Sequence, residues 1–408
     1  MEWKITNIGS LCNRVCSGGT PKSTNNAYYN GNIPWLNTKE VNFNRIYDTE
    51  KNITQLGLEN SSAKWISENS VIVAMYGATA GKVAITKIPI TTNQACCNLS
   101  INSEIADYNF VYYFLCSKFY ELSSLANGGA QQNLNAQIIK DFPIKIPVNL
   151  SDQRKIAGIL SALDSKIENN NKINANLESQ AQALFKSWFV DFTPFKDQPF
   201  VDSELGSIPQ GWKVVSLDDM TSKVGTGLNP RKNFTLGQGS NYYVTIKNMY
   251  NNRVYLDSRC DKITDEAIQK IQKRSKLQVG DLLFSGIGTI GRVALINKPP
   301  YNWNTSESVF NLHPSEEISS EFLYLLLLSN FFQNYVKINT LGGVQQGIRM
   351  ASLKSFRMAL PDRNVLIAFD RIIQPIVADI KRNDDENDSL AALRDTLLPK
   401  LMSGEIKL

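Results

Sequence analysis

The sequence contains one histidine, His313, among its 408 residues, and this scarcity excludes several kinds of active site. A mechanism or a metal site that needs two histidine side chains cannot be built from this chain. Its six cysteines form no Cys-x-x-Cys pair and no repeated spacing, which is typical of reduced thiols in a cytoplasmic protein. Cys12 and Cys16 are close in sequence, but with a single histidine available we expect no metal site.

Long apolar runs are also lacking. No stretch of about 18 apolar residues occurs, so we expect no membrane span. Residues 1–4 lack the charged and then apolar pattern of a signal peptide, and we expect a cytoplasmic protein. The 43 Lys and Arg exceed the 38 Asp and Glu by only five charges. The excess lies in residues 1–150 (12 basic, 10 acidic) and 196–362 (19 and 15), which gives weak support for a polyanionic partner.

Several enzyme motifs are present only in part. Gly286–Gly291 spells Gly-x-Gly-x-x-Gly, but a dinucleotide site needs a helix next, and Arg292–Ile296 is typical of a strand. Gly77–Lys82 is one residue short of a phosphate-binding loop and is followed by Val83 rather than Ser or Thr. Lys298–Tyr301 matches the Asn/Asp-Pro-Pro-Tyr motif of adenine methyltransferases except at its first position, where lysine cannot accept a hydrogen bond. We therefore predict no catalytic residue.

What the sequence does contain is a duplicated heptad seam. Alternating steps of four and three are typical of a coiled-coil seam, and a buried asparagine in it fixes the register at some cost in stability. Both copies place asparagine at the same two steps, so we predict that the two stretches pair with each other. Pro375 lies inside the second stretch and should kink or break it. The first seam is Ile156, Leu160, Leu163, Ile167, Asn170, Asn174, Leu177, Ala181, Leu184 and Trp188, and the second is Phe369, Ile373, Ile376, Ile380, Asn383, Asn387, Leu390, Arg394, Leu397 and Leu401.

The segments that precede each seam repeat as well. Val71–Ile85 matches Asp281–Leu295, and Gly128–Gln132 matches Gly342–Gln346, where both copies read Gly-Gly-x-Gln-Gln. The matching segments follow the same order in both halves of the chain. The chain therefore carries two similar heads, each followed by one seam. Identical pairs include Thr79 and Thr289, Gly81 and Gly291, and Asn98 and Asn311.

Each head is predicted to contain short β-branched strands and one compact helix, near 107–122 in the first and 319–336 in the second. Residues 20–68 and 225–278 show little mutual similarity and have the composition of loops, rich in Asn, Gly, Lys and Tyr. A scaffold that repeats while its polar loops differ suggests two related heads that recognise two different things.

Four strings in the chain resemble the specificity subunit of type I restriction–modification systems. Leu150–Ile167 resembles the start of that family's central spacer helix, and Leu184–Phe195 resembles its end. Ile208–Trp212 resembles the start of a second target-recognition domain, and Leu397–Glu405 resembles the family's C-terminal segment. The strings stand at the expected separations and span essentially the whole chain.

The resemblance implies an α+β fold in which two tandem α/β target-recognition domains are joined by two long helices that form an antiparallel coiled coil, a pseudo-twofold internal repeat. It implies a non-catalytic subunit that recognises an asymmetric bipartite site on double-stranded DNA. Two modification subunits would methylate adenine N6 with AdoMet, and restriction subunits with ATP and Mg would cleave, so we expect no cofactor on this chain. The expected segments are 1–148 (first domain), 149–192 (spacer helix), 193–208 (linker), 209–361 (second domain) and 362–408 (C-terminal helix).

The head residues that contact DNA can be proposed from residue type and repeated position. Gln and Asn can read an adenine edge, and Arg or Lys can read guanine or hold phosphate. A solvated loop side chain or a turn-stabilising amide is the alternative for each. A duplicated helical scaffold that binds only proteins is the alternative for the chain, although it does not explain the positive heads. The candidates are Gln131, Gln132, Gln345, Gln346 and Arg349, then Lys82 and Arg292, and then Lys22, Asn37, Lys39, Arg231, Lys232 and Lys247.

Overall fold

The structure, a computed structural model, describes residues 1–127, 134–342, 346–406 and 408. The chain divides into two compact units, Met1–Asn169 with Glu386–Leu408, and Asn170–Asp385. Two long helices, α5 (Leu150–Phe189) and α10 (Arg363–Ser403), contribute residues to both units. Within the described ranges, no helix is long and apolar enough to cross a bilayer.

The main sheet of unit 1 has five strands and is buried on both faces. Neighbouring strands are antiparallel except for one parallel pair, β4 with β7. Alternate residues of a strand point to opposite faces, so Val71 and Val73 lie in the core on the helical side, and Ile72 lies in the core on the other. In order across the sheet the strands are β2 (Cys12–Ser17), β9 (Cys96–Ile101), β6 (Val71–Ala74), β7 (Val83–Thr86) and β4 (Asn44–Ile46).

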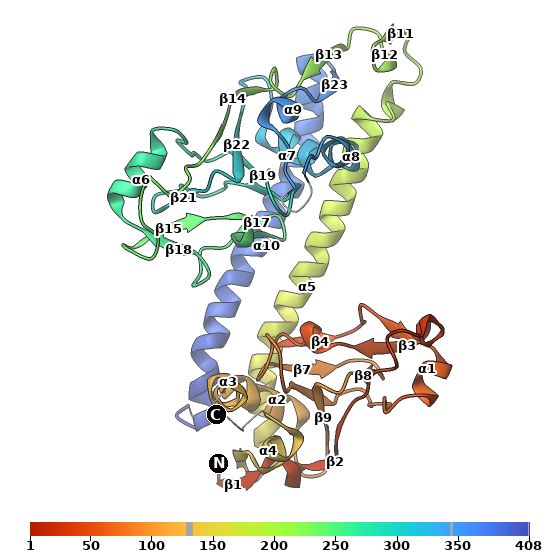
Figure 1. The fold of residues 1–408 in the computed structure, drawn as a ribbon, viewed down its shortest axis with the longest axis vertical. Coiled ribbons are helices and arrows are strands. Elements are labelled where there is room, and N and C mark those ends of the chain that lie inside the picture. Colours follow the sequence, from red (N-terminus) through yellow and green to blue (C-terminus); the bar gives the residue numbers. More distant parts are fainter. Residues whose placement is uncertain (128–133, 343–345, 407) are drawn as a thin grey trace. The chain divides into compact units, whose positions relative to one another are not determined.

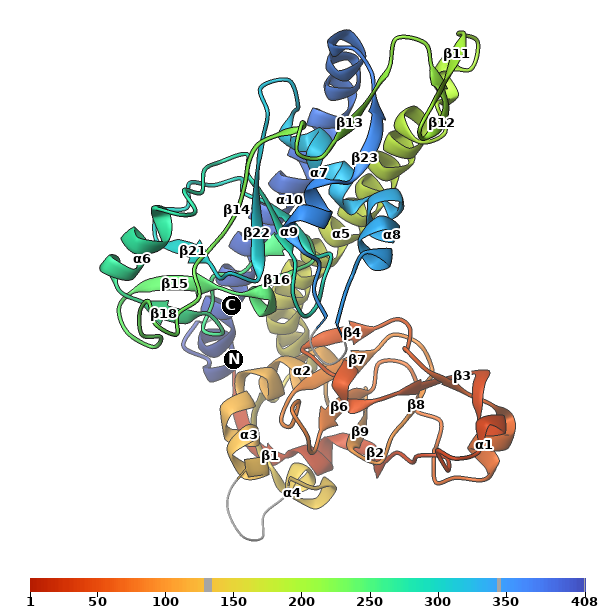
Figure 2. The same cartoon turned by 45° about the horizontal axis from the view of Figure 1, so that its top comes forward.

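A second, smaller sheet in unit 1 has β3 at its centre, antiparallel to β5 and parallel to β8. Figure 2 shows α1 at the end of this sheet that lies away from α2. A separate ladder joins β1 to β10 and brings the two ends of the first head together. These elements are β5 (Asn52–Ile53), β3 (Tyr29–Leu36), β8 (Thr91–Thr92), β1 (Trp3–Asn7), β10 (Pro143–Pro147), α1 (Gln55–Glu59), α2 (Tyr108–Ser117), α3 (Phe119–Asn127), α4 (Ala136–Asp141) and the 3-10 turns η1 (Ile8–Leu11), η2 (Asn26–Tyr28) and η3 (Thr38–Glu40).

Unit 2 repeats this plan. Its main sheet has the order β14-β22-β19-β20, its second sheet the order β18-β15-β21, and β13 pairs with β23. Figure 1 shows α7 and α8 beside the long helices of this unit and α6 at the opposite end of the head. The elements are β11 (Phe200–Ser203), β12 (Gly206–Pro209), β13 (Lys213–Ser216), β14 (Thr221–Thr226), β15 (Asn241–Val244), β16 (Met249–Tyr250), β17 (Arg253–Val254), β18 (Asp261–Ile263), β19 (Leu282–Ser285), β20 (Val293–Leu295), β21 (Trp303–Thr305), β22 (Val309–Pro314), β23 (Arg357–Leu360), α6 (Asp265–Gln272), α7 (Ser320–Leu328), α8 (Asn330–Ile338), α9 (Met350–Lys354), η4 (Thr193–Phe195) and η5 (Ile246–Asn248).

The repeat extends into the segments that the sequence presented as unrelated loops. Residues 20–68 contain β3, η3, β4, β5 and α1, and residues 225–278 contain β15, η5, β16, β17, β18 and α6. In both heads the central strand of the second sheet is antiparallel to one neighbour and parallel to the other. The prediction of loop-rich segments was therefore wrong, because these strands are short and their partners are distant in sequence.

The prediction of one compact helix in each of the ranges 107–122 and 319–336 was also wrong, because the chain forms α2 and α3 in the first and α7 and α8 in the second. In unit 2 the chain turns at Ser329, whose backbone is extended and whose hydroxyl accepts a hydrogen bond from Phe332 N (3.2 Å). A side chain that caps a new helix in this way ends the previous one. The strand predicted after the glycine turn is confirmed, because β20 follows Gly291 and pairs with β19. This hairpin has no helix where a dinucleotide site needs one.

The two long helices begin at capping residues. Asn149 accepts a hydrogen bond from Ser151 N (3.1 Å), and Asp362 accepts one from Asn364 N (2.8 Å). One predicted alternative, a break of the second helix at Pro375, is wrong, because α10 runs through this residue without interruption. Pro375 and Arg371, whose carbonyl loses its usual donor, are both exposed, so water can solvate that carbonyl.

Each unit contains an antiparallel contact between the two long helices. In unit 2, Asn174 Nδ2 donates to Asp384 Oδ1 (3.0 Å), and Asn383 Nδ2 donates to Asn174 Oδ1 (2.8 Å). In unit 1, Arg394 Nη1 donates to Asp164 Oδ1 (2.8 Å). The predicted seam positions that are buried are Ile156, Leu160, Asn170, Asn174, Ala181, Phe369, Ile373, Ile380, Asn387 and Leu401, and those that are half-buried are Leu163, Ile167, Leu177, Leu184, Trp188, Ile376, Asn383, Leu390, Arg394 and Leu397.

The buried face of α5 shifts by one residue near its end. Phe185 and Phe189 are buried where the heptad predicted Leu184 and Trp188. A straight helix with 3.6 residues per turn drifts by about 20° per heptad relative to a strict seven-residue repeat, which accounts for the shift. Phe189 packs against Phe322 of α7 (ring centroids 5.0 Å apart) and Phe369 of α10 (4.7 Å). The second head thus shares one core with the helices of its unit.

Candidate nucleic-acid interface

Both heads carry a lysine on a short 3-10 turn that follows the central strand of the second sheet. In unit 1 the turn is η3, after β3, and in unit 2 it is η5, after β15. Each turn is closed by a reciprocal capping box at the N-cap residue that precedes it, Asn37 or Thr245. Lys39 and Lys247 occupy the same, second step of the two turns. The structure therefore equates two candidate residues whose surrounding sequences show little similarity.

The two lysines are the exposed part of these turns. Their side chains are 57% and 54% exposed, and each forms an ion pair within its own head. Lys39 pairs with Glu50, which raises the pKa of Lys39 above its usual value mainly through the hydrogen bond between them. Lys247 Nζ lies 3.2 Å from Asp261 Oδ2. Exposed ion pairs of this kind contribute little to stability, so either lysine can exchange its carboxylate for a phosphate at little cost.

A glycine turn in the main sheet holds each lysine turn in place. In unit 1, the hydroxyl of Thr79 donates to Thr38 O (2.8 Å), and Lys82 Nζ donates to Asn42 Oδ1 (2.7 Å). In unit 2, Arg292 Nη1 donates to Ile246 O (2.8 Å) and to Met249 O (2.7 Å). Lys82 and Arg292 were predicted as DNA contacts, and this stays a prediction. In the structure Arg292 also holds the lysine turn of its head, whereas Lys82 donates to a side chain just after the turn.

The glycine of this turn has a conformation that other residues rarely adopt. Gly81 has φ +83° and Gly291 has φ +90°. A Cβ on Gly81 would lie 2.8 Å from Ser123 N, and one on Gly291 would lie 2.3 Å from Gln333 Oε1. The glycine shared by the two copies is thus explained by a left-handed backbone and close packing rather than by a bound cofactor.

In unit 2 a third segment joins this surface. Gly288 N donates to Gln346 O (2.8 Å), and Ile348 N donates to Gly286 O (2.9 Å). The end of the Gly-Gly-x-Gln-Gln loop therefore pairs with the glycine turn that holds η5. Gln346 and Arg349 are exposed there. We name the surface formed by residues 245–249, 286–292 and 346–349 the lysine-turn surface of the second head.

The remaining candidate residues belong to a capped turn, are exposed in loops, or lie outside the described residues. The side-chain oxygen of Asn37 accepts from Lys39 N (3.1 Å) as part of the cap. Lys22, Arg231 and Lys232 are exposed in the loops between β2 and β3 and between β14 and β15, which occupy the same place in the two heads. Gln131, Gln132 and Gln345 lie outside the described residues.

Thr79 is a positioning residue that was not among the predicted site residues. Its hydroxyl carries the contact between the glycine turn and the lysine turn of unit 1. A signal was available, since Thr79 and Thr289 are identical in the two copies. In the second copy, however, Arg292 makes the corresponding contact.

Known proteins share the sequence pattern of both heads. A family model described as the type I restriction modification DNA specificity domain matches residues 1–179 and again 209–385. A type I restriction enzyme specificity subunit (MjaIX) of Methanocaldococcus jannaschii is 29% identical, and the alignment covers 100% of this chain and 94% of that protein. The HindI specificity subunit of Haemophilus influenzae is 23% identical, over 99% and 100%.

A solved structure is similar in fold. The S subunit of a type I restriction–modification system from M. genitalium superposes with a TM-score of 0.56 at 18% identity, covering 98% of this chain and 96% of that one. At this identity the likeness concerns the fold alone.

Proposed function

We propose, from the premise that this chain belongs to the family of type I restriction–modification DNA specificity subunits, that each head recognises one half of an asymmetric bipartite site on duplex DNA. The family match covers both heads, and the second sheets and the first four strands of the main sheets have the same order in the two heads. The observation that carries the proposal is the lysine turn, which recurs at the same place in both heads on otherwise different surfaces. A lysine that both heads share can bind the phosphate backbone, which is the same at every site. The residues around it differ between the heads and can recognise different bases.

The chain is proposed to act without catalysing a reaction. Modification subunits would bring AdoMet and transfer its methyl group to adenine N6, and restriction subunits would bring ATP and Mg for translocation and cleavage. The glycine turns support this division of labour, because each one joins two antiparallel strands and packs under a lysine turn. The antiparallel contacts between α5 and α10 support a coiled-coil spacer between the heads.

A methyl-transfer assay tests this proposal. The purified chain with DNA and AdoMet should transfer no methyl group, whereas the chain with its modification subunit should methylate adenine at defined sites. Labelled methyl groups on DNA are counted in both reactions, and the modification subunit alone serves as the control. Methylation by the isolated chain, or identical site choice by the modification subunit without it, would contradict the proposal.

The lysine-turn surface makes a separate prediction about salt. Lys247→Ala should reduce the slope of log K against log salt by about 1, because one phosphate contact is lost. Its melting temperature should stay near that of the wild type, since the side chain is largely exposed. Lys298→Ala is the matched control, an exposed lysine paired with Asp385 and outside this surface. Equal slopes for the two variants would show that η5 does not contact DNA.

Arg292→Met, unlike Lys247→Ala, should lower the stability of the protein as well as its affinity for DNA. Two backbone carbonyls of the turn would lose a charged donor, so the free energy of unfolding should fall by about 1–3 kcal/mol. DNA affinity should fall as well, because the turn that carries Lys247 is no longer held. Denaturant unfolding and DNA titration measure the two effects. Unchanged stability would show that Arg292 does not position the turn.

A further inference from the structure

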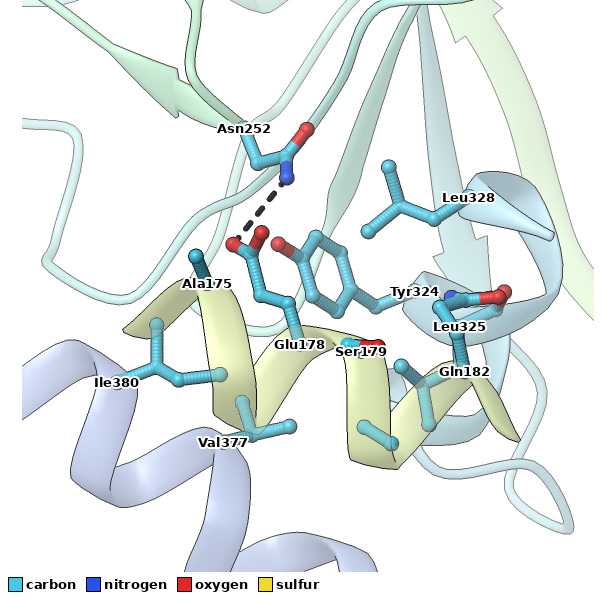
Figure 3. A pocket seen from close by; sticks show the side chains of 11 residues that line it. Ala175, Glu178, Ser179, Gln182, Asn252, Tyr324, Leu325, Leu328, Val377 and Ile380 are labelled. Carbon is cyan, nitrogen blue, oxygen red and sulfur yellow. Dashed lines mark hydrogen bonds between the residues drawn. The ribbon is translucent and has the colours of Figure 1, made fainter. Parts of the chain in front are cut away.

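Unit 2 contains a cavity of about 350 Å³ where α5, α10 and α7 meet. Figure 3 shows aliphatic side chains, among them Leu325, Leu328, Val377 and Ile380, along its walls. Glu178 of α5, Asn252 of the β16–β17 turn and Tyr324 of α7 lie together at one end. The cavity thus has apolar walls and a polar end.

The internal repeat explains why the cavity is there. At the corresponding place in unit 1, Arg394 reaches across to Asp164 (2.8 Å), and Tyr113 donates to the same carboxylate (2.6 Å). The heptad register equates Arg394 with Ala181 and Asp164 with Val377, and the head repeat equates Tyr113 with Leu325. Small and aliphatic residues therefore stand in unit 2 where a long arginine and its polar partners fill the space in unit 1.

The end of the cavity is negatively charged. Glu178 Oε1 accepts a hydrogen bond from Asn252 Nδ2 (3.3 Å), and within the described ranges Glu178 takes part in no ion pair. The pKa of Tyr324 is raised, first by burial and then by the negative charges of Glu178 and Asp384. A neighbouring cavity of about 450 Å³ shares Glu178 and Asn252. The carboxylate of Asp384 in that cavity is already paired with Arg253 (3.4 Å).

We propose that this cavity receives a lysine or arginine side chain of a modification subunit bound to the helices. The aliphatic part of that side chain would lie against Leu325, Val377 and Ile380, and its cation would pair with Glu178. This partner supplies from outside what Arg394 supplies from within unit 1. Long basic side chains suit such a site because their methylene stems are apolar while their ends are charged. The inference rests on the proposed function, since it names the partner.

Removing the charge is the first test. Glu178→Gln should weaken binding of the chain to its modification subunit by roughly tenfold, because a partly buried cation loses its counter-ion. Asp379→Asn is the matched control, a carboxylate on α10 whose exposed ion pair with Arg382 lies outside the cavity. Binding is measured by titration calorimetry with the full chain. DNA binding by the chain alone should be the same for both variants.

Filling the cavity is the second test. Ala181→Met adds a long apolar side chain on the wall of the cavity, so it should keep or raise the melting temperature while weakening the complex by tenfold or more. Ala183→Met, two residues away and exposed, is the control and should bind like the wild type. A photo-crosslinking residue in place of Gln182, which also lines the cavity, should capture a lysine- or arginine-containing peptide of the modification subunit.

The outcomes separate the two proposals. If the wild-type chain binds no modification subunit, the proposed function itself fails. If the complex forms and both Glu178→Gln and Ala181→Met bind like the wild type, the function stands and the inference about the cavity is wrong. A crosslink at Gln182 to a peptide without Lys or Arg would also overturn it.

Discussion

Exchanging residues 1–148 for the first head of another family member should change one half of the methylated DNA motif and leave the other half intact. The reason is that the heads repeat in scaffold and differ in their polar surfaces. The structure shows that this segment is closed, because β1 and β10 pair antiparallel and bring its two ends together. The effect is all-or-none at the affected half-site, since a different set of bases is read. Methylome sequencing of a strain that carries the hybrid measures it.

The reciprocal exchange is the matched control. Residues 209–361 are closed in the same way by β13 and β23, and their replacement should change only the other half-site. The hybrids should retain the contacts between a head and its helix. Arg45 of β4 donates to Ser161 Oγ (2.8 Å) and Ser165 Oγ (2.9 Å) of α5, so the donor head needs an arginine at this position. A change in both halves, or in neither, would contradict independent reading.

Sequence patterns predict the main sheet of each head but not its second, smaller sheet. The main sheet could be predicted because the runs Val71–Ala74 and Leu282–Phe284 are apolar and buried on both faces. The second sheet could not, since β5, β8 and β18 are two or three residues long and one pairing is parallel between distant segments. Strands this short leave no periodic pattern in the sequence.

The candidate site could be predicted only in part, because residue type does not show what a side chain contacts. Residue type identified Lys39 and Lys247, which the structure places at equivalent steps of two turns. Arg292 was also predicted from its residue type, and its guanidinium donates hydrogen bonds to two backbone carbonyls. A sequence shows that a residue is charged but not which carbonyls stand near it. The same limit applies to Ala181. Its small side chain is informative only in comparison with Arg394, the residue at the same seam position of the other copy.

Adding four residues to each long helix, next to but outside the predicted layer of Asn170, Asn174, Asn383 and Asn387, should lengthen the gap between the two half-sites. The seam from Ile156 to Trp188 covers 33 residues, which is roughly 50 Å at about 1.5 Å per residue. Four residues add about 6 Å, which is close to two base-pair steps of about 3.4 Å each. Sequencing of methylated sites from an active variant measures the gap.

Rotation has to be separated from length in this experiment. Four residues turn a helix about 40° beyond a full turn, so some variants should lose activity because the heads no longer face the same side of the duplex. Seven residues in each helix keep the heptad seam in step and add about 10 Å, or about three base pairs. The seven-residue variant is therefore the control for rotation. If an active variant of either length methylates sites with the parent's gap, the helices hold the partners together without measuring the DNA.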